Sequence, residues 1–487
     1  MSDNLKQRTA KGFAWGLLNQ GSTQLLNFAF GIVLARQLTR ADYGIVGVLT
    51  VFTLVAGNLQ ACGFTQGLCN MEKPEHKDYN SVFWFNISMS ACLYVLLFLC
   101  APLIADFFGS PELVAVSRLV FLTLPISAVS TIAGAYMFKN MMVRENTIVG
   151  AIALLCSGTV GITLAFLDYN YWALAWQQVV YSTIVTISRY CLCPFRPSVP
   201  FTFDTVRRLF PFSVKMMLTT VLNSLSQQIL TVLFARHFPM ATVGSYSQAN
   251  KWNTMASGML QGTISQIAQP VMAEIRDDEE RSLRVLRKMV RFTAFFSFPA
   301  MFGLALVAEE FILTTIGDEW LPCVDILRVL AIAGSTLPIY ALLQNTAISR
   351  GRSDLYLWLN VVQIAVQIGI VEVLQNYPIE YMVIATSVFT LLFLFVWHAF
   401  TRKLTADYSL VFFLKDILPF ALPAAFTMLI TWWVTDCVFA SLHFSFILII
   451  RIVLAAVIYA AIMYCSKAEI MRECMRYVKQ VKSAKHE

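Results

Sequence analysis

Long apolar runs recur along the whole chain, and each is bounded by a short polar segment. A helix that crosses a bilayer needs about 20 mostly apolar residues. Windows of that length predict fourteen transmembrane helices, at residues 12–36, 43–68, 80–105, 112–138, 146–167, 169–192, 209–236, 242–272, 289–313, 321–348, 355–374, 379–399, 416–440 and 444–465. The hydrophobic pattern therefore predicts an all-α polytopic membrane protein.

The composition agrees with this class. Hydrophobic residues make up 57% of the 487 positions and charged residues only 13%, against about 25% charged residues in soluble domains. The 11 cysteines are scattered, without a CxxC pair or a histidine at metal-ligand spacing, so we expect no metal and no cofactor. The first apolar run is longer than the core of a cleavable signal, which spans about 7–15 residues, and we expect no such signal.

The distribution of Lys and Arg predicts the orientation. We place the N-terminus in the cytoplasm and assign cations at the ends of spans to the adjoining segments. The cytoplasmic segments then hold 28 of the 36 Lys and Arg residues, the opposite segments hold three, and five lie within spans. Cytoplasmic loops of membrane proteins are enriched in Lys and Arg, so this asymmetry predicts that both termini are cytoplasmic.

A short polar turn occurs twice in the chain, at an offset of 200 residues. VLARQLTRADYGIV at 33–46 aligns with LFARHFPMATVGSY at 233–246. Six predicted spans separate the two copies, and an even number predicts a parallel repeat about an axis along the membrane normal. The fourth and tenth spans also correspond, because each carries an arginine followed by a proline, Arg118 with Pro125 and Arg328 with Pro338, and each proline is expected to kink its helix.

The repeat predicts how the chain is divided and where it moves. We predict two six-helix lobes, then two additional transmembrane helices with a basic cytoplasmic tail, at residues 1–200, 201–415 and 416–487. The predicted gate or hinge residues are those that recur in the two turns, Arg36, Gly44, Arg236 and Gly244. Repetition favours a scaffold role for the two arginines, such as tying the turn to backbone carbonyl groups, and a gate role is the alternative.

The chain resembles the multidrug/oligosaccharidyl-lipid/polysaccharide exporter superfamily. The resemblance is carried by the pattern LAR-x-L-x(4)-YG at 34–44, by its echo ahead of YSQANKW at 246–252, and by the spans that start from a cytoplasmic N-terminus. Within the superfamily, the chain most resembles the polysaccharide flippases, which move undecaprenyl-diphosphate-linked oligosaccharides. This resemblance implies two six-helix lobes around a central cavity that opens alternately to the two sides of a bacterial cytoplasmic membrane.

Five cations within the predicted spans are the first candidates for contact with a cargo. A charge near the bilayer centre costs about 2.5–3.5 kcal/mol on insertion scales, so it needs a role, a partner or an exit to water. Cations that line a water-filled cavity lower the cost of moving a diphosphate. These predicted substrate-binding cations are Lys215, Lys251, Arg118, Arg328 and Arg451. The alternatives are buried structural pairs for the lysines and snorkelling to the outer surface for the arginines.

Amide side chains in the first two helices of each lobe are candidates for hydrogen bonds to sugar hydroxyl groups. They are Gln20, Gln24, Asn27, Asn223 and Gln227. Their alternative role is interhelical hydrogen bonding. Acids within spans are few, and we nominate Glu372 as the residue that couples transport to a proton or sodium gradient.

The sequence predicts a transporter and not an enzyme, because it contains no nucleophile–base arrangement, glycine-rich phosphate loop or large external loop. The predicted function is alternating-access flipping of undecaprenyl-diphosphate-linked oligosaccharide repeat units, for surface polysaccharides such as capsule or lipopolysaccharide. The predicted partners are this lipid-linked cargo, membrane lipids and a polysaccharide polymerase, with no nucleic acid. The alternative is a cation-coupled multidrug or small-molecule exporter of the same fold. The first span has no acid, which argues against cationic drugs.

Overall fold

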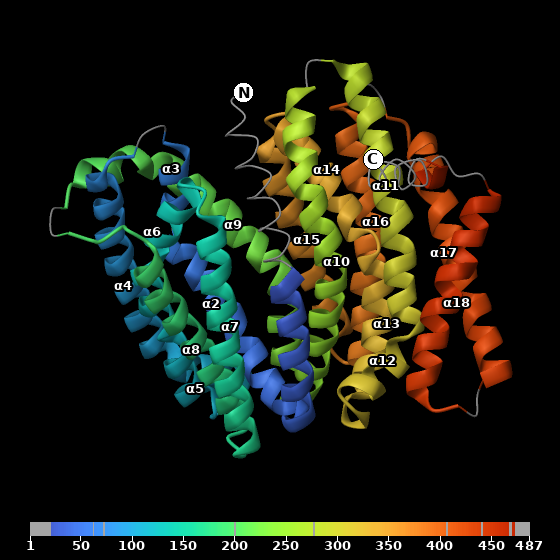
Figure 1. The fold of residues 1–487 in the computed structure, drawn as a ribbon, viewed down its shortest axis with the longest axis horizontal. Coiled ribbons are helices and arrows are strands. Elements are labelled where there is room, and N and C mark those ends of the chain that lie inside the picture. The colour runs from blue at the N-terminus through green and yellow to red at the C-terminus, as the bar shows by residue number, and fades with distance from the viewer. Residues whose placement is uncertain are drawn as a thin grey trace, which may run out of the picture. The chain divides into compact units, whose positions relative to one another are not determined.

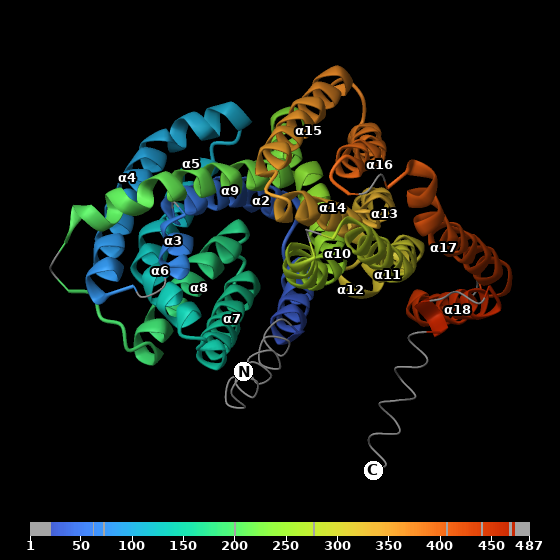
Figure 2. The same ribbon diagram turned by 90° about the horizontal axis from the view of Figure 1, so that it is seen from above.

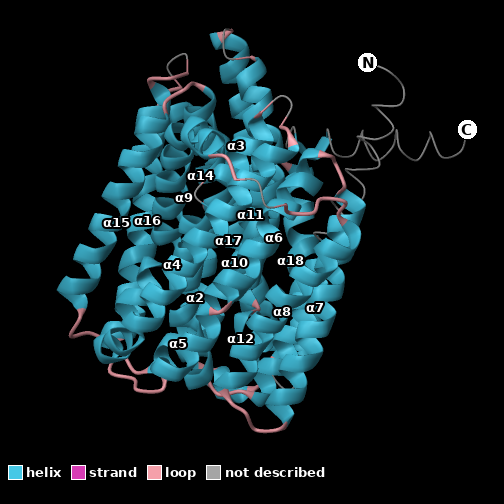
Figure 3. Ribbon diagram, turned by 90° about the vertical axis from the view of Figure 1, so that its left-hand side faces the viewer, coloured by secondary structure: helices cyan, strands magenta, loops and turns pink. Residues whose placement is uncertain are grey.

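The computed structural model describes residues 21–61, 63–71, 74–198, 201–275, 278–405, 408–439, 442–466 and 470–472. Every regular element within these residues is a helix, and Figure 3 shows the helices joined by short loops. Apolar segments form helices in a membrane because a helix satisfies its backbone hydrogen bonds internally. The predicted all-α fold class is confirmed.

The chain forms two compact units, Met1–Gly244 and Ser245–Glu487. The first unit is coloured blue to green in Figure 1. It contains a helix through the described residues 21–37, then α2 (Arg40–Ala61), α3 (Phe64–Asn70), α4 (His76–Phe108), α5 (Leu113–Phe121), α6 (Thr123–Lys139), α7 (Val143–Phe166), α8 (Tyr171–Leu192) and α9 (Phe203–His237). Helix α8 packs against α7 and α6, as Figure 2 shows for α7, and α9 packs against α2 and α4.

The second unit contains the remaining helices, although α10 begins just before the division. These elements are α10 (Met240–Glu274), α11 (Glu279–Leu306), α12 (Ala308–Thr315), the 3-10 helix η1 (Asp318–Trp320), α13 (Pro322–Gly334), α14 (Leu337–Ser349), α15 (Ser353–Leu374), α16 (Ile379–Arg402), α17 (Leu410–Phe439) and α18 (Phe444–Cys465). Helix α11 packs against α17 and α13, and α17 packs against α18.

Eleven helices in the described part of the chain are long and apolar enough to cross a membrane. Large apolar side chains on them point outward: Leu99 and Leu103 of α4 are 68% and 67% exposed, and Trp433 of α17 is 63% exposed. Apolar surface of this kind is unfavourable in water, so lipid covers it, and the chain is a multi-pass membrane protein. The count of fourteen spans and the whole-lobe repeat stay predictions.

The fourth and tenth predicted spans, which carry Pro125 and Pro338, are both interrupted. Helix α5 ends at Phe121 and α6 starts at Thr123, two residues before Pro125. Helix α13 ends at Gly334 and α14 starts at Leu337, directly before Pro338. Each proline therefore lies in the first turn of a new helix, where its missing N–H group leaves no intrahelical hydrogen bond unmade.

The two copies of the repeated turn have the same local structure. One joins the helix that ends at residue 37 to α2, the other joins α9 to α10, and each turn has two residues outside the helices. Ala35 and Ala235 are buried before the turns, and Gly44 and Gly244 are buried after them. In these turns, the two similar sequences therefore adopt the same local backbone structure.

Candidate functional site

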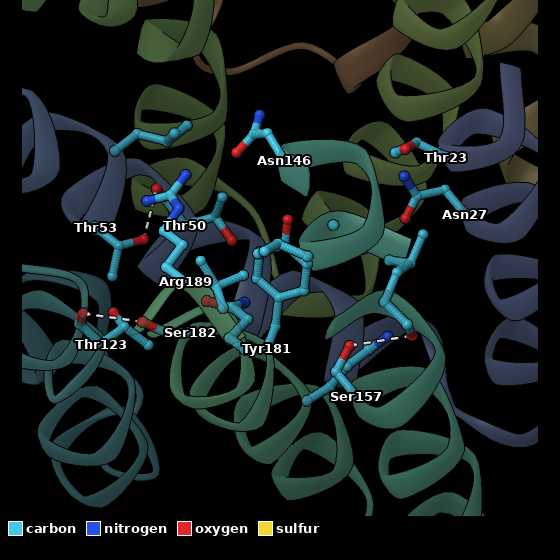
Figure 4. A pocket seen from close by; sticks show the side chains of 17 residues that line it. Thr23, Asn27, Thr50, Thr53, Thr123, Asn146, Ser157, Tyr181, Ser182 and Arg189 are labelled. Carbon is cyan, nitrogen blue, oxygen red and sulfur yellow. Dashed lines mark hydrogen bonds between the residues drawn. The ribbon is translucent and has the colours of Figure 1, made fainter. Parts of the chain in front are cut away.

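A polar pocket of about 710 Å³ lies inside the first unit, which is within the range of about 300–1,000 Å³ for small-molecule sites. Its lining comes from the helix at 21–37 and from α2, α6, α7 and α8. The polar lining residues are Thr23, Asn27, Thr50, Thr53, Thr123, Asn146, Ser157, Gln177, Gln178, Tyr181, Ser182 and Arg189. In Figure 4, Thr23 and Asn27 lie on one side, Thr53 and Arg189 on the other, and Tyr181 between them.

Glycines of α7 let the neighbouring helices close around the pocket. A Cβ added at Gly158 would lie 2.5 Å from the ring of Phe30 in the first helix. A Cβ added at Gly161 would lie 3.2 Å from the side chain of Gln177 in α8. Small residues allow helices in a membrane to approach closely, so these glycines bring the polar side chains of three helices to one space.

Arg189 carries the one formal charge among the described residues that line the pocket. Its Nη1 donates to the carbonyl oxygen of Ser130 at 3.3 Å. Its Nε is buried and has no hydrogen-bond partner in the part of the chain that the structure describes. The guanidinium lies over Gly134, where an added Cβ would be 2.8 Å from Cζ. The glycine thus makes room for a cation that no described acid neutralises.

Several hydroxyl groups of the lining donate to the backbone of their own helix. Thr50 donates to the carbonyl of Val46 at 2.9 Å, and Thr53 donates to the carbonyl of Thr50 at 2.9 Å. A hydroxyl group has one hydrogen to donate and two lone pairs that accept, so these oxygens remain acceptors for a ligand. With the amides of Asn27 and Gln178, the pocket can bind a ligand that is rich in hydroxyl groups.

The α8 side of this pocket was not predicted from the sequence. The positive-inside count assigns Arg189 to a cytoplasmic segment, because Arg189 is close to the end of a span. A usable signal was present: Gln178, Ser182, Val185 and Arg189 follow one another at intervals of four, three and four residues. Residues at this spacing share one helix face, and all four line the pocket.

The predicted amide contacts are divided among several places. Asn27 lines the pocket, whereas Gln24 is half-buried and is not among the lining residues. Gln20 lies outside the described residues. Asn223 and Gln227 lie on α9, where the intervening Ser224 accepts a 2.6 Å hydrogen bond from the Asn58 amide of α2. Interhelical hydrogen bonding therefore occurs on this stretch of α9.

The two predicted lysines belong to different units. Lys215 is exposed on α9 in the first unit. Lys251 is half-buried on α10 in the second unit, and its Nζ lies 5.7 Å from the centroid of the Trp252 ring. Neither lines the polar pocket, and their contact with a cargo stays a prediction.

The predicted arginines Arg118 and Arg328 each have a local partner. The guanidinium of Arg118 lies 4.4 Å from the centroid of the Phe98 ring. Arg328 forms ion pairs with Glu309 at 2.8 Å and Asp325 at 3.1 Å, near the surface of the second unit. Both contacts are structural alternatives to binding a substrate.

Arg451 is buried and fully engaged. Its Nη1 lies 2.6 Å from Glu310 of α12, its Nη2 lies 3.2 Å from Asp436 of α17, and its Nε donates to Thr435 at 3.0 Å. This geometry ties α18 to α12 and α17. Glu372, the nominated coupling residue, is half-buried on α15.

The glycines of the two turns pack against backbone. A Cβ added at Gly44 would overlap the carbonyl group of Met240, and one added at Gly244 would overlap the carbonyl group of Arg40. The starts of α2 and α10 therefore touch without an intervening side chain. Arg236 lies 4.9 Å from the centroid of the Phe107 ring, and Arg36 is exposed.

A second hollow, of about 530 Å³, lies along α17. Its lining is apolar apart from Lys415: Val411, Leu414, Lys415, Leu418, Pro419, Leu422 and Pro423. Such a surface suits a hydrocarbon chain.

Comparison with known proteins identifies relatives. A family profile described as "Polysaccharide biosynthesis protein" matches residues 33–325. The succinoglycan biosynthesis transport protein ExoT of Rhizobium meliloti (strain 1021) is 24% identical over 67% of this chain and 66% of its own length, just under two thirds. The lipopolysaccharide biosynthesis protein WzxC of Escherichia coli (strain K12) is 21% identical over 74% of this chain and 73% of its own. The teichuronic acid biosynthesis protein TuaB of Bacillus subtilis (strain 168) is 21% identical over 72% and 73%.

Two solved structures share the fold. The inward closed conformation of the lipid II flippase MurJ has a TM-score of 0.74 at 16% identity, and covers 94% of this chain and 100% of that one. The inward-facing conformation of a multidrug resistance MATE family transporter of the MOP superfamily has a TM-score of 0.60 at 15% identity, and covers 79% and 95%.

Proposed function

The chain belongs to the polysaccharide biosynthesis protein family, and on that premise we propose that it is a flippase for a lipid-linked oligosaccharide. The family and the fold confirm the predicted resemblance to the multidrug/oligosaccharidyl-lipid/polysaccharide exporter superfamily. One relative is named for succinoglycan transport, and one structural neighbour is named a lipid II flippase. The first name supports a saccharide cargo, and the second supports a cargo that is attached to a lipid.

The observation that carries this proposal is the polar pocket among the membrane helices. A saccharide that crosses a bilayer leaves water, and each hydroxyl group without a hydrogen-bond partner costs free energy. The pocket offers hydroxyl, amide and guanidinium groups in that setting. These groups replace the hydrogen bonds to water, so the pocket lowers the barrier for the sugar while the lipid stays in the bilayer.

The remaining parts of the cargo have candidate contacts elsewhere. Lys215 and Lys251 are each proposed to attract the diphosphate, because a cation stabilises phosphate oxygens. The apolar hollow along α17 is proposed to accept part of the polyprenyl chain, with Lys415 at the phosphate end. Gly44 and Gly244 are proposed to form the pivot for alternating access, and Glu372 is proposed to couple transport to an ion gradient.

The proposed setting is the cytoplasmic membrane of a bacterium, with both termini in the cytoplasm. The oligosaccharide would arrive on the cytoplasmic face and leave on the outer face, where a polysaccharide polymerase would receive it. The excess of Lys and Arg in alternate segments supports this orientation. The product would be a surface polysaccharide such as a capsule or lipopolysaccharide.

The alternative is a cation-coupled multidrug exporter, which the likeness to the MATE family transporter supports at the level of fold. A cationic drug requires an anionic or π-rich site. The described residues that line the polar pocket include no acid and do include Arg189. This charge favours the oligosaccharide flippase.

A reconstituted assay tests the proposal. The protein would be placed in liposomes with an undecaprenyl-diphosphate-linked oligosaccharide, and the fraction of glycan that reaches the opposite leaflet would be measured with a membrane-impermeant enzyme. Wild-type protein should move the glycan, and an imposed proton or sodium gradient should change the rate. Lys215→Ala and Lys251→Ala should each slow the movement of the glycan. Export of a cationic dye without movement of the glycan would instead establish the alternative.

A further inference from the structure

We propose that Arg189 makes the polar pocket selective for saccharides that carry a carboxylate, such as a uronic acid or an acidic substituent. This inference rests on the proposed function and narrows the chemical class of its cargo. Its basis is the charge of the pocket, the Nη2 of one guanidinium, which is unpaired within the described residues, and the neutral groups around it.

The first observation is a charge without a counterion. No ion pair joins Arg189 to an acid within the described residues, and none of the described lining residues is acidic. Removing a cation from water without a compensating anion is costly. The pocket therefore favours a ligand that brings negative charge.

The second observation is that two nitrogens of the guanidinium have no partner within the described residues, although Nε is itself buried. Nη1 is directed to the carbonyl of Ser130, and neither Nε nor Nη2 has a hydrogen-bond partner in the described structure. The Nε and Nη2 groups of an arginine form a parallel pair of donors that matches a carboxylate. Arg287 uses this same pair to bind Asp416, at 2.7 and 3.1 Å. In Arg189 no described group occupies the equivalent edge, and because Nε is buried, Nη2 is the donor that a ligand can reach.

The third observation is that a glycine makes room for the guanidinium. Gly134 of α6 lies directly beneath it, and an added Cβ would be 2.8 Å from both Cζ and Nη1. Gly134 is a positioning residue for Arg189, because a side chain at this position would displace the guanidinium.

The neutral lining indicates which anion is bound. A diphosphate carries more than one negative charge and calls for several cations, whereas the described lining supplies one. The groups around Arg189 are hydroxyls and amides, including Thr50, Thr53 and Gln178. One cation among neutral hydrogen-bonding groups matches one carboxylate on a sugar ring.

The test compares two cargoes that differ in one group. Both would carry undecaprenyl diphosphate and the same disaccharide, which ends in glucuronate in one cargo and in glucose in the other. In proteoliposomes, Arg189→Gln should reduce the flux of the acidic cargo by about tenfold, as expected for losing a charge-assisted hydrogen bond, and reduce the neutral flux much less. Arg189→Lys, which keeps the charge, should retain part of the preference.

Two further variants guard the interpretation. Gly134→Ala should weaken the preference for the acidic cargo by displacing the guanidinium, while the charge stays present. Lys403→Gln is the matched control for loss of one cation, because Lys403 is exposed in the second unit and lies outside the pocket. Thermal unfolding would establish that each variant is folded. If Arg189→Gln does not fold, the comparison of the two cargoes is made with Arg189→Lys and Gly134→Ala.

Each outcome has one meaning. An equal loss of both cargoes in Arg189→Gln would identify the diphosphate as the bound anion and overturn the proposal, as would an unchanged preference in the folded variants. Failure of the wild-type protein to move either cargo would count against the flippase function itself. Movement of both cargoes without selectivity would leave that function standing and refute only the role of Arg189.

Discussion

Gly44 and Gly244 lie against each other where α2 and α10 begin, and a Cβ added at Gly244 would be 3.0 Å from the backbone nitrogen of Gly44. Each glycine also faces a carbonyl group of the other helix. Backbone can approach backbone this closely only where the Cβ atom is missing. The contact joins the two copies of the repeated turn.

We expect Gly44→Ala and Gly244→Ala to push these helix starts apart. Overpacking of this kind costs about 1–3 kcal/mol, so both variants should unfold at a lower temperature and move cargo more slowly. Gly57→Ala in α2 and Gly258→Ala in α10 are matched controls, because an added Cβ at either position meets nothing within 4 Å. Normal melting and flux in both turn variants would exclude a role for the contact.

The ion pair of Arg451 with Glu310 should contribute strongly to stability. Arg451→Gln leaves the charge of Glu310 buried without its partner, which costs about 3–5 kcal/mol. Arg328→Gln is the comparison, because its pair with Glu309 is exposed and such pairs are worth about 0–1 kcal/mol. Denaturant titration of the purified protein in detergent would measure both losses. Equal losses would contradict the assigned difference between buried and exposed pairs.

Asp416 should hold the start of α17 against α11. Its carboxylate accepts hydrogen bonds from Arg287 and Arg291, and from the hydroxyl group of Tyr408 at 2.8 Å. Burial raises the pKa of the Tyr408 phenol, so Tyr408 remains a donor. We expect Asp416→Asn to increase hydrogen exchange at the start of α17 strongly, and Tyr408→Phe to cost about 1 kcal/mol. Slow exchange in Asp416→Asn would refute this role.

Gly158 should control the size of the polar pocket. Gly158→Ala places a methyl group against the ring of Phe30 and forces the first helix or the ring to shift. The expected result is slower flux of acidic and neutral cargoes alike, unlike the selective loss expected from Arg189→Gln. Gly369→Ala in α15 is the control, because its surroundings are open. Unchanged flux in a folded Gly158→Ala protein would place the cargo elsewhere.

The helices could be predicted from the sequence because their signal is local. Apolar runs, the repeated turn and two prolines place the helical segments, and the breaks before Pro125 and Pro338 fall within the predicted spans. The pairing of charges could not be predicted. Arg451 is 141 residues from Glu310 in sequence, and hydropathy alone does not distinguish a cation that meets a buried acid from one that meets a cargo.

The pocket was only partly predictable for a related reason. Asn27 stood out because it shares a helix face with other amides, whereas Arg189 was assigned to a cytoplasmic segment by its distance from the end of its span. Its importance comes from Gly134 on another helix and from the absence of a nearby acid among the described lining residues. Both are properties of packing, and neither can be predicted from the residues next to Arg189 in the sequence.

The two C-terminal helices are not a removable extension of the second unit. Asp416 of α17 neutralises cations of α11, and Arg451 of α18 neutralises Glu310 of α12. A chain that stopped before α17 would leave charges of both signs without their counterions. The charged residues of α11 and α12 therefore require α17 and α18. A shorter relative of this protein would be expected to carry neutral residues at the positions of Arg287, Arg291 and Glu310.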